Sequence, residues 1–213
     1  MNSPGRTCPL HYRYAPDALA AAQPLRAQTL YVVGGVYGNV ESLREVLAMK
    51  RDEEQRSGFS VELLFNGDFN WLDVDAQSFV EINETVLRHT AMLGNVEAEL
   101  GSADSDNGCG CNYPDHVDAQ TVENSNAIMD SLRETARAFP ELARRIAALP
   151  MFRRVEVGGQ AIAVVHGDAE SLAGWGFGFE AMPPMRGEPK LQALVAPAHL
   201  TPAARIADYF RAA

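Results

Sequence analysis

The sequence predicts an α/β fold with a central mixed β-sheet, or more than one such sheet, flanked by helices. Three observations lead to this class. Short β-branched and aromatic runs alternate with amphipathic stretches from residue 29 to residue 95, which is the order of a parallel sheet with right-handed crossovers. Two apolar runs then flank Gly158-Gly159, a pair that suits a tight antiparallel hairpin. The 213 residues are 46 % apolar and 22 % charged, which is the balance of one globular domain.

The first half of the chain alternates strands and helices. The run from Thr29 to Val33 is rich in β-branched residues and ends at two glycines, as a buried strand does. After Asn39, which can cap a helix, the apolar residues fall on one stripe of the helical period. The same alternation then repeats. We predict strands at 29–33, 61–65 and 91–93 and helices at 40–55 and 75–89.

The second half begins with irregular structure. Residues 101–118 are rich in small and acidic residues, which favour loops. Pro140 suits the first position of a helix. We predict loops at 101–118 and 174–188, helices at 119–139, 140–149 and 201–212, and strands at 152–157 and 160–165.

The domain organisation follows from where the first strand begins. We predict residues 1–28 as an N-terminal leader that packs on the domain, and residues 29–213 as the domain itself. The leader carries four prolines and a short aromatic and basic stretch at 11–14. We assign it a structural role.

Composition and charge exclude several functional classes. The chain has 18 Lys and Arg against 28 Asp and Glu, so its net charge of −10 repels nucleic acid and anionic membrane surfaces. No run approaches the roughly 20 consecutive apolar residues of a membrane helix, and the first residues lack the order of a secretory signal. We expect a cytoplasmic protein with no membrane partner and no nucleic-acid partner. The oligomeric state stays open.

Polar residues follow three of the predicted strands. Asp68 follows the second strand, Asn95 the third, and His166 the last strand of the hairpin. In an open α/β sheet, ligands gather beyond the carboxyl ends of the strands, so we expect these three side chains to converge. Aspartate, asparagine and neutral histidine together suit a divalent ion such as manganese, iron or zinc. The sequence therefore predicts a metal site.

The order and spacing of these residues resemble the calcineurin-like metallophosphoesterase family over most of residues 29–168. Gly67-Asp68 resembles the family motif whose aspartate bridges two metal ions. Asn95 is similar to the asparagine ligand of the second ion, and His166 to the histidine ligand of the same ion. The resemblance implies a metal-dependent hydrolase that acts on phosphate mono- or diesters of a small phosphorylated substrate.

The chain departs from the family pattern in its first motif. Where the family has Asp-x-His, this chain has Gly35-Val36-Tyr37, and Val96 stands where the family has the histidine that assists the leaving group. The resemblance implies a metallophosphoesterase-like sandwich of sheets. The family's terminal His-x-His strand is missing before Ala213, so we expect a C-terminally incomplete fold. These losses imply one divalent ion in place of two, and a weakened or specialised activity.

Three further residues are candidates for the chemistry. Glu97 and Asp168 lie close to the predicted ligands in the sequence, so either could serve as a substitute ligand or as the catalytic base. Asn39 begins a helix, whose N-terminus favours a phosphate, so we place it in substrate binding. These residues also allow purely structural roles: Glu97 and Asp168 could cap helices or face solvent, and Asp68 and Asn95 could only shape turns. A protein that binds a phosphorylated ligand or a partner without turnover is the alternative function.

The cysteines and the tryptophans each allow two structural interpretations. Three cysteines are too few for a secreted disulfide framework, so we expect reduced thiols; a zinc site built from Cys109, Cys111 and His116 is the alternative. Trp71 and the stretch Trp175-Gly176-Phe177-Gly178-Phe179 could wall a substrate pocket. We expect local packing of these aromatic side chains.

Overall fold

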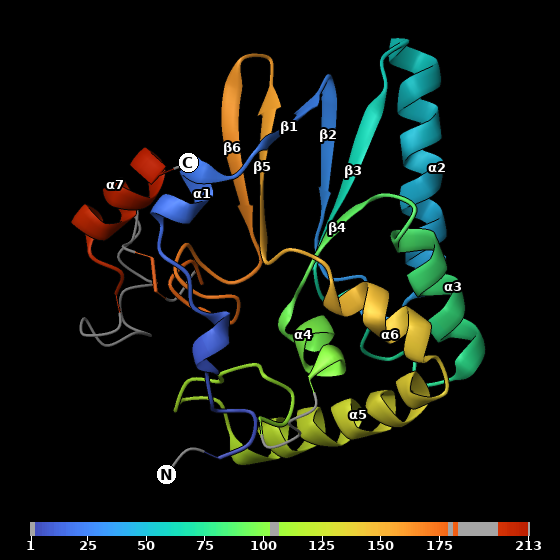
Figure 1. The fold of residues 1–213 in the computed structure, drawn as a ribbon, viewed down its shortest axis with the longest axis vertical. Helices are drawn as coiled ribbons and strands as arrows, with labels where there is room; N and C mark the ends of the chain where they lie inside the picture. Colours follow the sequence, from blue (N-terminus) through green and yellow to red (C-terminus); the bar gives the residue numbers. More distant parts are fainter. Residues whose placement is uncertain (1–2, 103–106, 179–180, 183–199, 213) are drawn as a thin grey trace.

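Two three-stranded sheets form the centre of the molecule (Figure 1). The computed structural model describes residues 3–102, 107–178, 181–182 and 200–212. One sheet has the order β2-β3-β4 and is entirely parallel, whereas the other has the order β1-β5-β6 and is mixed. The predicted α/β class, with sheets flanked by helices, is confirmed.

The strands and helices alternate along the chain in the predicted order between residues 29 and 95. The strands are β1 (Pro24–Ala27), β2 (Thr29–Val33), β3 (Val61–Asn66), β4 (Thr90–Met92), β5 (Phe152–Val157) and β6 (Gln160–Val165). The helices are η1 (Leu10–Tyr12), α1 (Asp17–Ala21), α2 (Val40–Ser57), α3 (Ala76–Val86), α4 (Asn95–Gly101), α5 (Ala119–Arg137), α6 (Pro140–Ala147) and α7 (Ala203–Ala212). No helix in this described part of the chain is long and apolar enough to cross a membrane.

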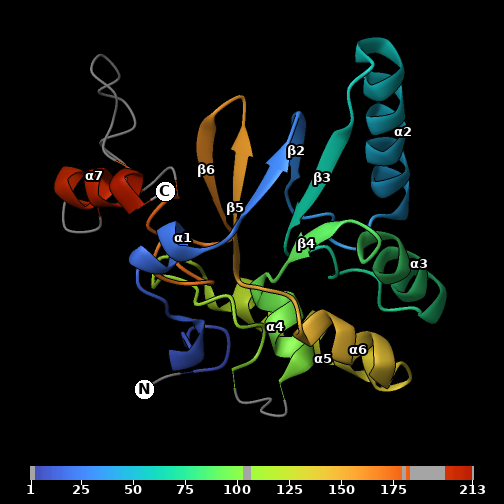
Figure 2. The ribbon, with the colours of Figure 1, turned by 45° about the horizontal axis from the view of Figure 1, so that its top comes forward.

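The two sheets pack face to face through an apolar layer. Leu64 and Met92 of the parallel sheet form one buried apolar cluster with Val155 and Val164 of the mixed sheet. The other face of the parallel sheet is covered by α2 and α3, which lie along it in Figure 2. Strand β3 is therefore buried on both faces, which explains why its sequence is a nearly continuous apolar run.

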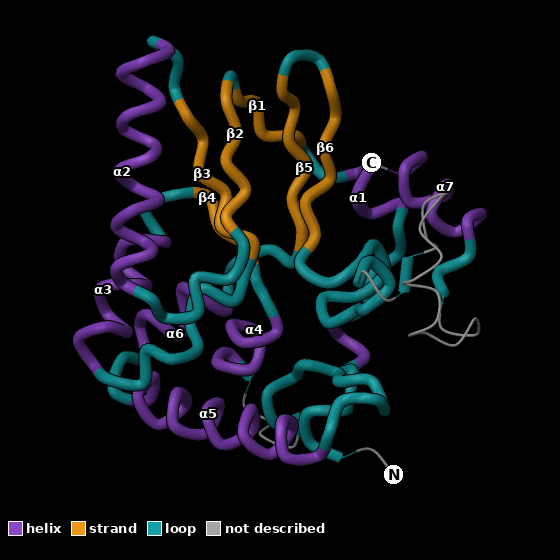
Figure 3. The backbone as a smooth tube through the Cα atoms, turned by 180° about the vertical axis from the view of Figure 1, so that it is seen from behind, coloured by secondary structure: helices purple, strands orange, loops and turns teal. Residues whose placement is uncertain are grey.

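Helices α4, α5 and α6 lie together beyond one end of the sheets, as Figure 3 shows from behind. Phe79 of α3, Met129 of α5 and Ile146 of α6 are fully buried in one cluster there. The carboxyl ends of β3 and β4 lead into this region, so the loops that follow these strands are held between the sheets and the helices.

The leader contributes a strand that we did not predict. β1 runs parallel to β5 and lies at the edge of the mixed sheet. Pro24 is its first residue, a position that tolerates the missing N–H of proline. Four residues that begin with proline carry almost no strand signal in the sequence, so only the pairing with β5 defines β1. Residues 3–28 therefore pack on the domain and also complete its second sheet.

Helix α4 is a further element that the sequence analysis missed, besides η1, α1 and β1 in the leader. We expected a polar turn at Gly94-Asn95, but the helix begins directly at Asn95 and runs to Gly101. Its seven residues are too few to show a helical period. Asn39 caps α2 as predicted, because its side chain accepts a hydrogen bond from the backbone N–H of Ser42 at 2.9 Å.

Candidate active site

The three predicted ligands converge at the ends of three strands. Asp68 lies just beyond β3, Asn95 begins α4 directly after β4, and His166 follows β6. The Nε2 atom of His166 is 3.2 Å from Oδ1 of Asn95 and 3.4 Å from Oδ2 of Asp68. The convergence predicted from the sequence is confirmed, across two different sheets.

The histidine ring is oriented by the backbone of β3. Nδ1 of His166 donates a hydrogen bond to the carbonyl oxygen of Asn66 at 2.7 Å, so Nε2 points towards Asp68 and Asn95. Burial lowers the pKa of His166, but the Asp68 carboxylate outweighs burial and raises this pKa to about 9. The cluster therefore stabilises a positive charge beside Asp68.

The asparagine side chain is also held in one orientation. Nδ2 of Asn95 donates a hydrogen bond to the carbonyl oxygen of Cys109 at 3.0 Å, which turns Oδ1 towards His166. One oxygen of Asp68, Oδ1, accepts a hydrogen bond from the backbone N–H of Val96 at 3.2 Å. The second oxygen of Asp68, Oδ2, faces His166.

These donor atoms fit a single divalent ion. Ligand atoms that share an ion at about 2.1 Å lie roughly 3 to 3.5 Å apart, and the separations from Nε2 of His166 fall in that range. The bond from Nδ1 to a backbone carbonyl is the usual second contact of a histidine that binds a metal. Among the residues that the structure describes, no group of three or more His, Cys, Asp and Glu side chains could hold a metal. The third donor here is the amide oxygen of Asn95.

Two residues at the site have a strained backbone. Asp68 has a φ of 49° and Tyr37 a φ of 53°, in the left-handed region that residues with a side chain seldom adopt. A backbone hydrogen bond of 3.1 Å from the N–H of Tyr37 to the carbonyl of Asp68 links them. Such strain is typical of functional sites, where the surrounding structure holds a side chain in place.

Glu97 does not have the catalytic position that we predicted. Its side chain is fully buried and accepts hydrogen bonds from the backbone N–H groups of Asp68, Asn70 and Gly94 at 2.6, 3.1 and 3.0 Å. Burial, followed by the nearby Asp68 charge, raises the pKa of Glu97. The carboxylate ties the loops after β3 and β4 together, because buried backbone donors require an acceptor.

Asp168 and Asn39 are corrected for the same kind of reason. The Asp168 carboxylate accepts hydrogen bonds from three backbone N–H groups, those of Glu170, Ser171 and Gly176. Asn39 is exposed and serves as the cap of α2. Neither side chain lines the cavity beside Asp68, so the structure does not support a catalytic role for Asp168 or substrate binding by Asn39.

The cavity beside Asp68 has a volume of about 720 Å³. His166, Asp68 and Asn95 line it together with aromatic side chains from four separate loops. We expected local packing for the aromatic residues. Trp71 packs against the apolar cluster that contains Phe79 and Met129, and the ring of Phe177 lies 5.4 Å from that of Tyr209, so both pack locally and also line the cavity. Phe179 lies outside the described residues. The aromatic side chains that line the cavity are Tyr37, Trp71, Tyr113, Trp175 and Phe177.

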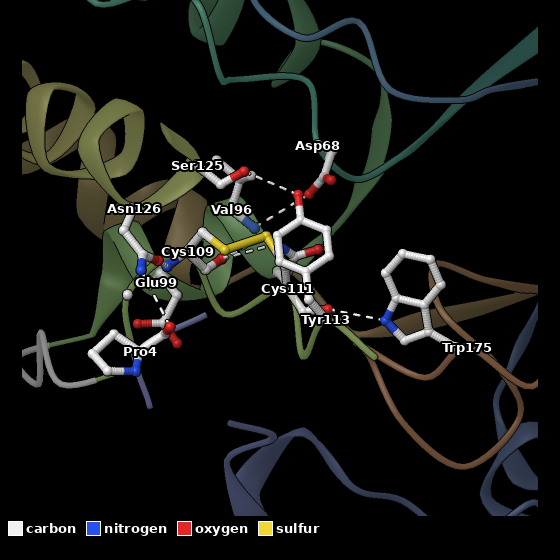
Figure 4. The surroundings of a disulfide bond; sticks show 12 residues. Pro4, Asp68, Val96, Glu99, Cys109, Cys111, Tyr113, Ser125, Asn126 and Trp175 are labelled. Atoms are coloured by element: carbon white, nitrogen blue, oxygen red, sulfur yellow. Dashed lines mark hydrogen bonds between the residues drawn. A yellow bond between two sulfur atoms is a disulfide. The ribbon is translucent and has the colours of Figure 1, made fainter. Parts of the chain in front are cut away.

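Cys109 and Cys111 form a disulfide, so the expectation of reduced thiols is wrong for this pair. Figure 4 shows Tyr113 and Trp175 in the surroundings of this bond, and Cys111 also lines the cavity. The zinc alternative is not supported either, because the sulfur atoms bond to each other and His116 is exposed. The disulfide stiffens the loop whose Cys109 carbonyl orients Asn95.

No family model and no curated protein matches the chain. Among solved structures, it is similar to a hypothetical protein from Pyrococcus horikoshii OT3, with 18 % sequence identity and a TM-score of 0.44. The similarity covers 63 % of this chain and 54 % of the other, so the chain spans about half the length of the solved structure that it matches. A likeness of this degree says nothing about activity, and the function must be inferred from the residues of the site.

Proposed function

We propose that this protein is a metal-dependent hydrolase of phosphate mono- or diesters that works with one divalent ion, manganese, iron or zinc. The observation that carries the proposal is the set of donor atoms from Asp68, Asn95 and His166, grouped within 3.4 Å of the histidine Nε2 at the wall of a cavity. A small phosphorylated substrate fits a cavity of about 720 Å³. A cytoplasmic location stays a prediction.

The residues of the chain divide the work between them. Asp68, Asn95 and His166 would hold the ion, which supplies a Lewis acid and an activated water for attack on phosphorus. Asn66 and Cys109 orient two of these ligands through their carbonyl oxygens. Such second contacts fix the direction of each ligand.

Tyr37 is positioned to contact the substrate. Burial and the Asp68 charge raise the pKa of the Tyr37 hydroxyl, which keeps its proton at neutral pH. The side chain lines the cavity at the position where the family motif has a histidine. We expect the hydroxyl to donate a hydrogen bond to a phosphoryl oxygen.

Elemental analysis and turnover test the proposal together. The purified chain, loaded with manganese, iron or zinc, should retain close to one ion, and Asp68→Ala and His166→Ala should each lose it. Matched controls are Asp52→Ala and His116→Ala, which change exposed residues of the same types. The loaded parent should hydrolyse aryl phosphate mono- or diesters, and both site variants should not. A parent that binds no ion under any of these conditions would rule the proposal out.

The second candidate function is a non-catalytic module that binds a phosphorylated ligand or a partner. It is favoured by the placement of Glu97 and Asp168, whose carboxylates are occupied by backbone N–H groups. Among the described residues that line the cavity, Asp68 is then the one acid. A parent that binds the ion and a phosphorylated ligand without any turnover would support this candidate.

A further inference from the structure

Several aromatic side chains that line the cavity leave part of their surface exposed. Tyr37, Trp175 and Phe177 leave 49, 36 and 37 % of their surfaces exposed, although each has apolar surface that packing could cover. Exposed aromatic faces that line one cavity offer stacking surfaces to a ligand, and stacking on such faces does not depend on charge.

Hydrogen bonds fix the rings of Trp175 and Tyr113. Nε1 of Trp175 donates to the carbonyl oxygen of Cys111 at 3.0 Å, and the hydroxyl of Tyr113 lies 3.0 Å from that of Ser125. The two rings lie with centroids 6.0 Å apart at an angle of 45°, so they support each other without stacking flat (Figure 4). A ring tethered at its polar edge presents its faces to the cavity.

Tyr37 is held by its backbone. Its N–H donates to the carbonyl of Asp68, its carbonyl accepts from the N–H of Leu72 at 3.2 Å, and its φ is 53°. A left-handed backbone that keeps an aromatic side chain half exposed is costly. A ligand that stacks on the ring explains why the chain keeps this arrangement.

The charge of the cavity favours the same ligand. None of the described residues that line it is lysine or arginine, so the ion held by Asp68, Asn95 and His166 would be the positive group that the phosphate meets. Recognition of the organic part of the ligand is left to the aromatic walls.

We propose that the ligand is a phosphoester whose organic part is a flat aromatic ring, either an aryl group or a nucleobase, which lies against Tyr37 and Trp175. The phosphate half of this proposal rests on the proposed function, whereas the ring half does not. Trp175 and Tyr37 would then determine specificity for the ring.

Calorimetric titration with phosphonates tests the ring half, because a carbon–phosphorus bond resists phosphoester hydrolysis. The full chain with manganese is titrated with phenylphosphonate, with propylphosphonate, and with a phosphonate analogue of a nucleoside monophosphate. The aromatic ligands should bind about tenfold more tightly than propylphosphonate. The two tryptophans of the chain, Trp71 and Trp175, both line the cavity, so their fluorescence should report the same saturation.

Variants locate the effect. Trp175→Leu and Tyr37→Leu should each remove most of the tenfold preference, and Trp175→Phe should retain it because a ring remains. Phe59→Leu is the matched control, since Phe59 is 55 % exposed and does not line the cavity. Circular dichroism checks that each variant is folded.

The outcomes separate the two proposals. Equal affinity for phenyl- and propylphosphonate overturns the ring site, as does a preference that survives both leucine variants or a failure of every phosphonate to bind. A ring preference in a protein without turnover supports the ring site and leaves the hydrolase proposal refuted. If phenylphosphonate binds more tightly than the nucleoside analogue, the ring is an aryl group. If the nucleoside analogue binds more tightly, the ring is a nucleobase.

Discussion

At the scale of single residues, the position of Asp68 depends on a neighbour without a side chain. A Cβ atom added at Gly94 would lie 2.1 Å from Oδ1 of Asp68 and 2.5 Å from its backbone nitrogen. Gly67, with a φ of 75°, packs against Gly94 from the other side. The loops after β3 and β4 can approach so closely only because both positions are glycine.

The variant Gly94→Ala should therefore displace the Asp68 carboxylate. We expect a loss of about 1 to 3 kcal/mol in the free energy of unfolding, measured in urea, since the backbone contact cannot give way. Ion binding should fall in the same variant. Gly34→Ala is the control, because a Cβ at Gly34 meets nothing within 4 Å, and an equal loss in both variants would contradict the explanation.

Asp73 is a buried acid that the proposed chemistry does not use. Its Oδ1 accepts a hydrogen bond from the N–H of Trp71 at 2.7 Å, while its Oδ2 has no partner among the described residues. Burial raises the pKa of Asp73 from 3.8 to about 6. The folded protein thus binds more protons than the unfolded chain between these two pH values, so the contribution of Asp73 to stability falls as the pH rises through them.

Replacing Asp73 by asparagine should remove this fall in stability at rising pH. Relative to the parent, Asp73→Asn should gain stability from pH 4 to pH 7, by up to about 3 kcal/mol for a shift of this size. Urea unfolding at pH 4, 5, 6 and 7 measures it. Asp75→Asn gives the opposite sign, because the hydrogen bond from Ser78 lowers the pKa of Asp75. If the difference in the free energy of unfolding between Asp73→Asn and the parent did not change with pH, the burial argument would be refuted.

At the scale of elements, the loop after α4 orients the site. The carbonyl of Cys109 holds the amide of Asn95, and the N–H of Cys109 donates to Oδ1 of Asn126 on α5 at 2.9 Å. The disulfide to Cys111 closes this loop on itself. Helix α5 is thereby connected to the ligand that begins α4.

Removing the disulfide should weaken the site without unfolding the protein. The double variant Cys109→Ser/Cys111→Ser should bind the ion about tenfold more weakly, because the orientation of Asn95 is no longer enforced. Competition with a chromophoric chelator measures this affinity. Cys8→Ser, which changes the free thiol, is the control, and unchanged affinity in the double variant would show that the loop does not position Asn95.

At the scale of the whole molecule, the leader is joined to the domain by a buried polar chain. The hydroxyl of Tyr12, a fully buried residue, donates to Oε1 of Glu99 at 2.6 Å, and Oε2 of Glu99 pairs with Arg133 at 3.0 Å. Burial and the Glu99 charge raise the pKa of Tyr12, so the hydroxyl keeps its proton. The leader, α4 and α5 are thus linked through one carboxylate.

Tyr12→Phe should lower the free energy of unfolding by about 1.5 to 3 kcal/mol, since it removes a hydrogen bond to a buried charge. Thermal and urea unfolding measure the loss, and the transition should stay cooperative. Tyr31→Phe serves as the control, because the Tyr31 hydroxyl makes no hydrogen bond with the described residues. Equal losses in the two variants would mean that the Glu99 contact is not the cause.

Much of the fold between residues 29 and 165 could be predicted from local patterns. The β-branched runs and helical stripes are local in sequence, and the boundaries of β2, α2 and β5 lie within two residues of the predicted ones. Short elements were missed, because β1 and α4 have four and seven residues and show no period. Their formation depends on contacts with distant residues.

The sequence by itself indicated that Asp68, Asn95 and His166 lie close together, because each follows a strand and ligands gather at the ends of strands in α/β folds. Only the tertiary structure decided that these strands belong to two different sheets. Only the tertiary structure decided that Glu97 and Asp168 bind backbone N–H groups, and that five aromatic side chains of the described residues line the cavity. The physical reason is that the periodicity of apolar residues predicts where a strand or helix runs. The direction of each side chain depends on which buried donors and apolar surfaces the whole fold brings beside it.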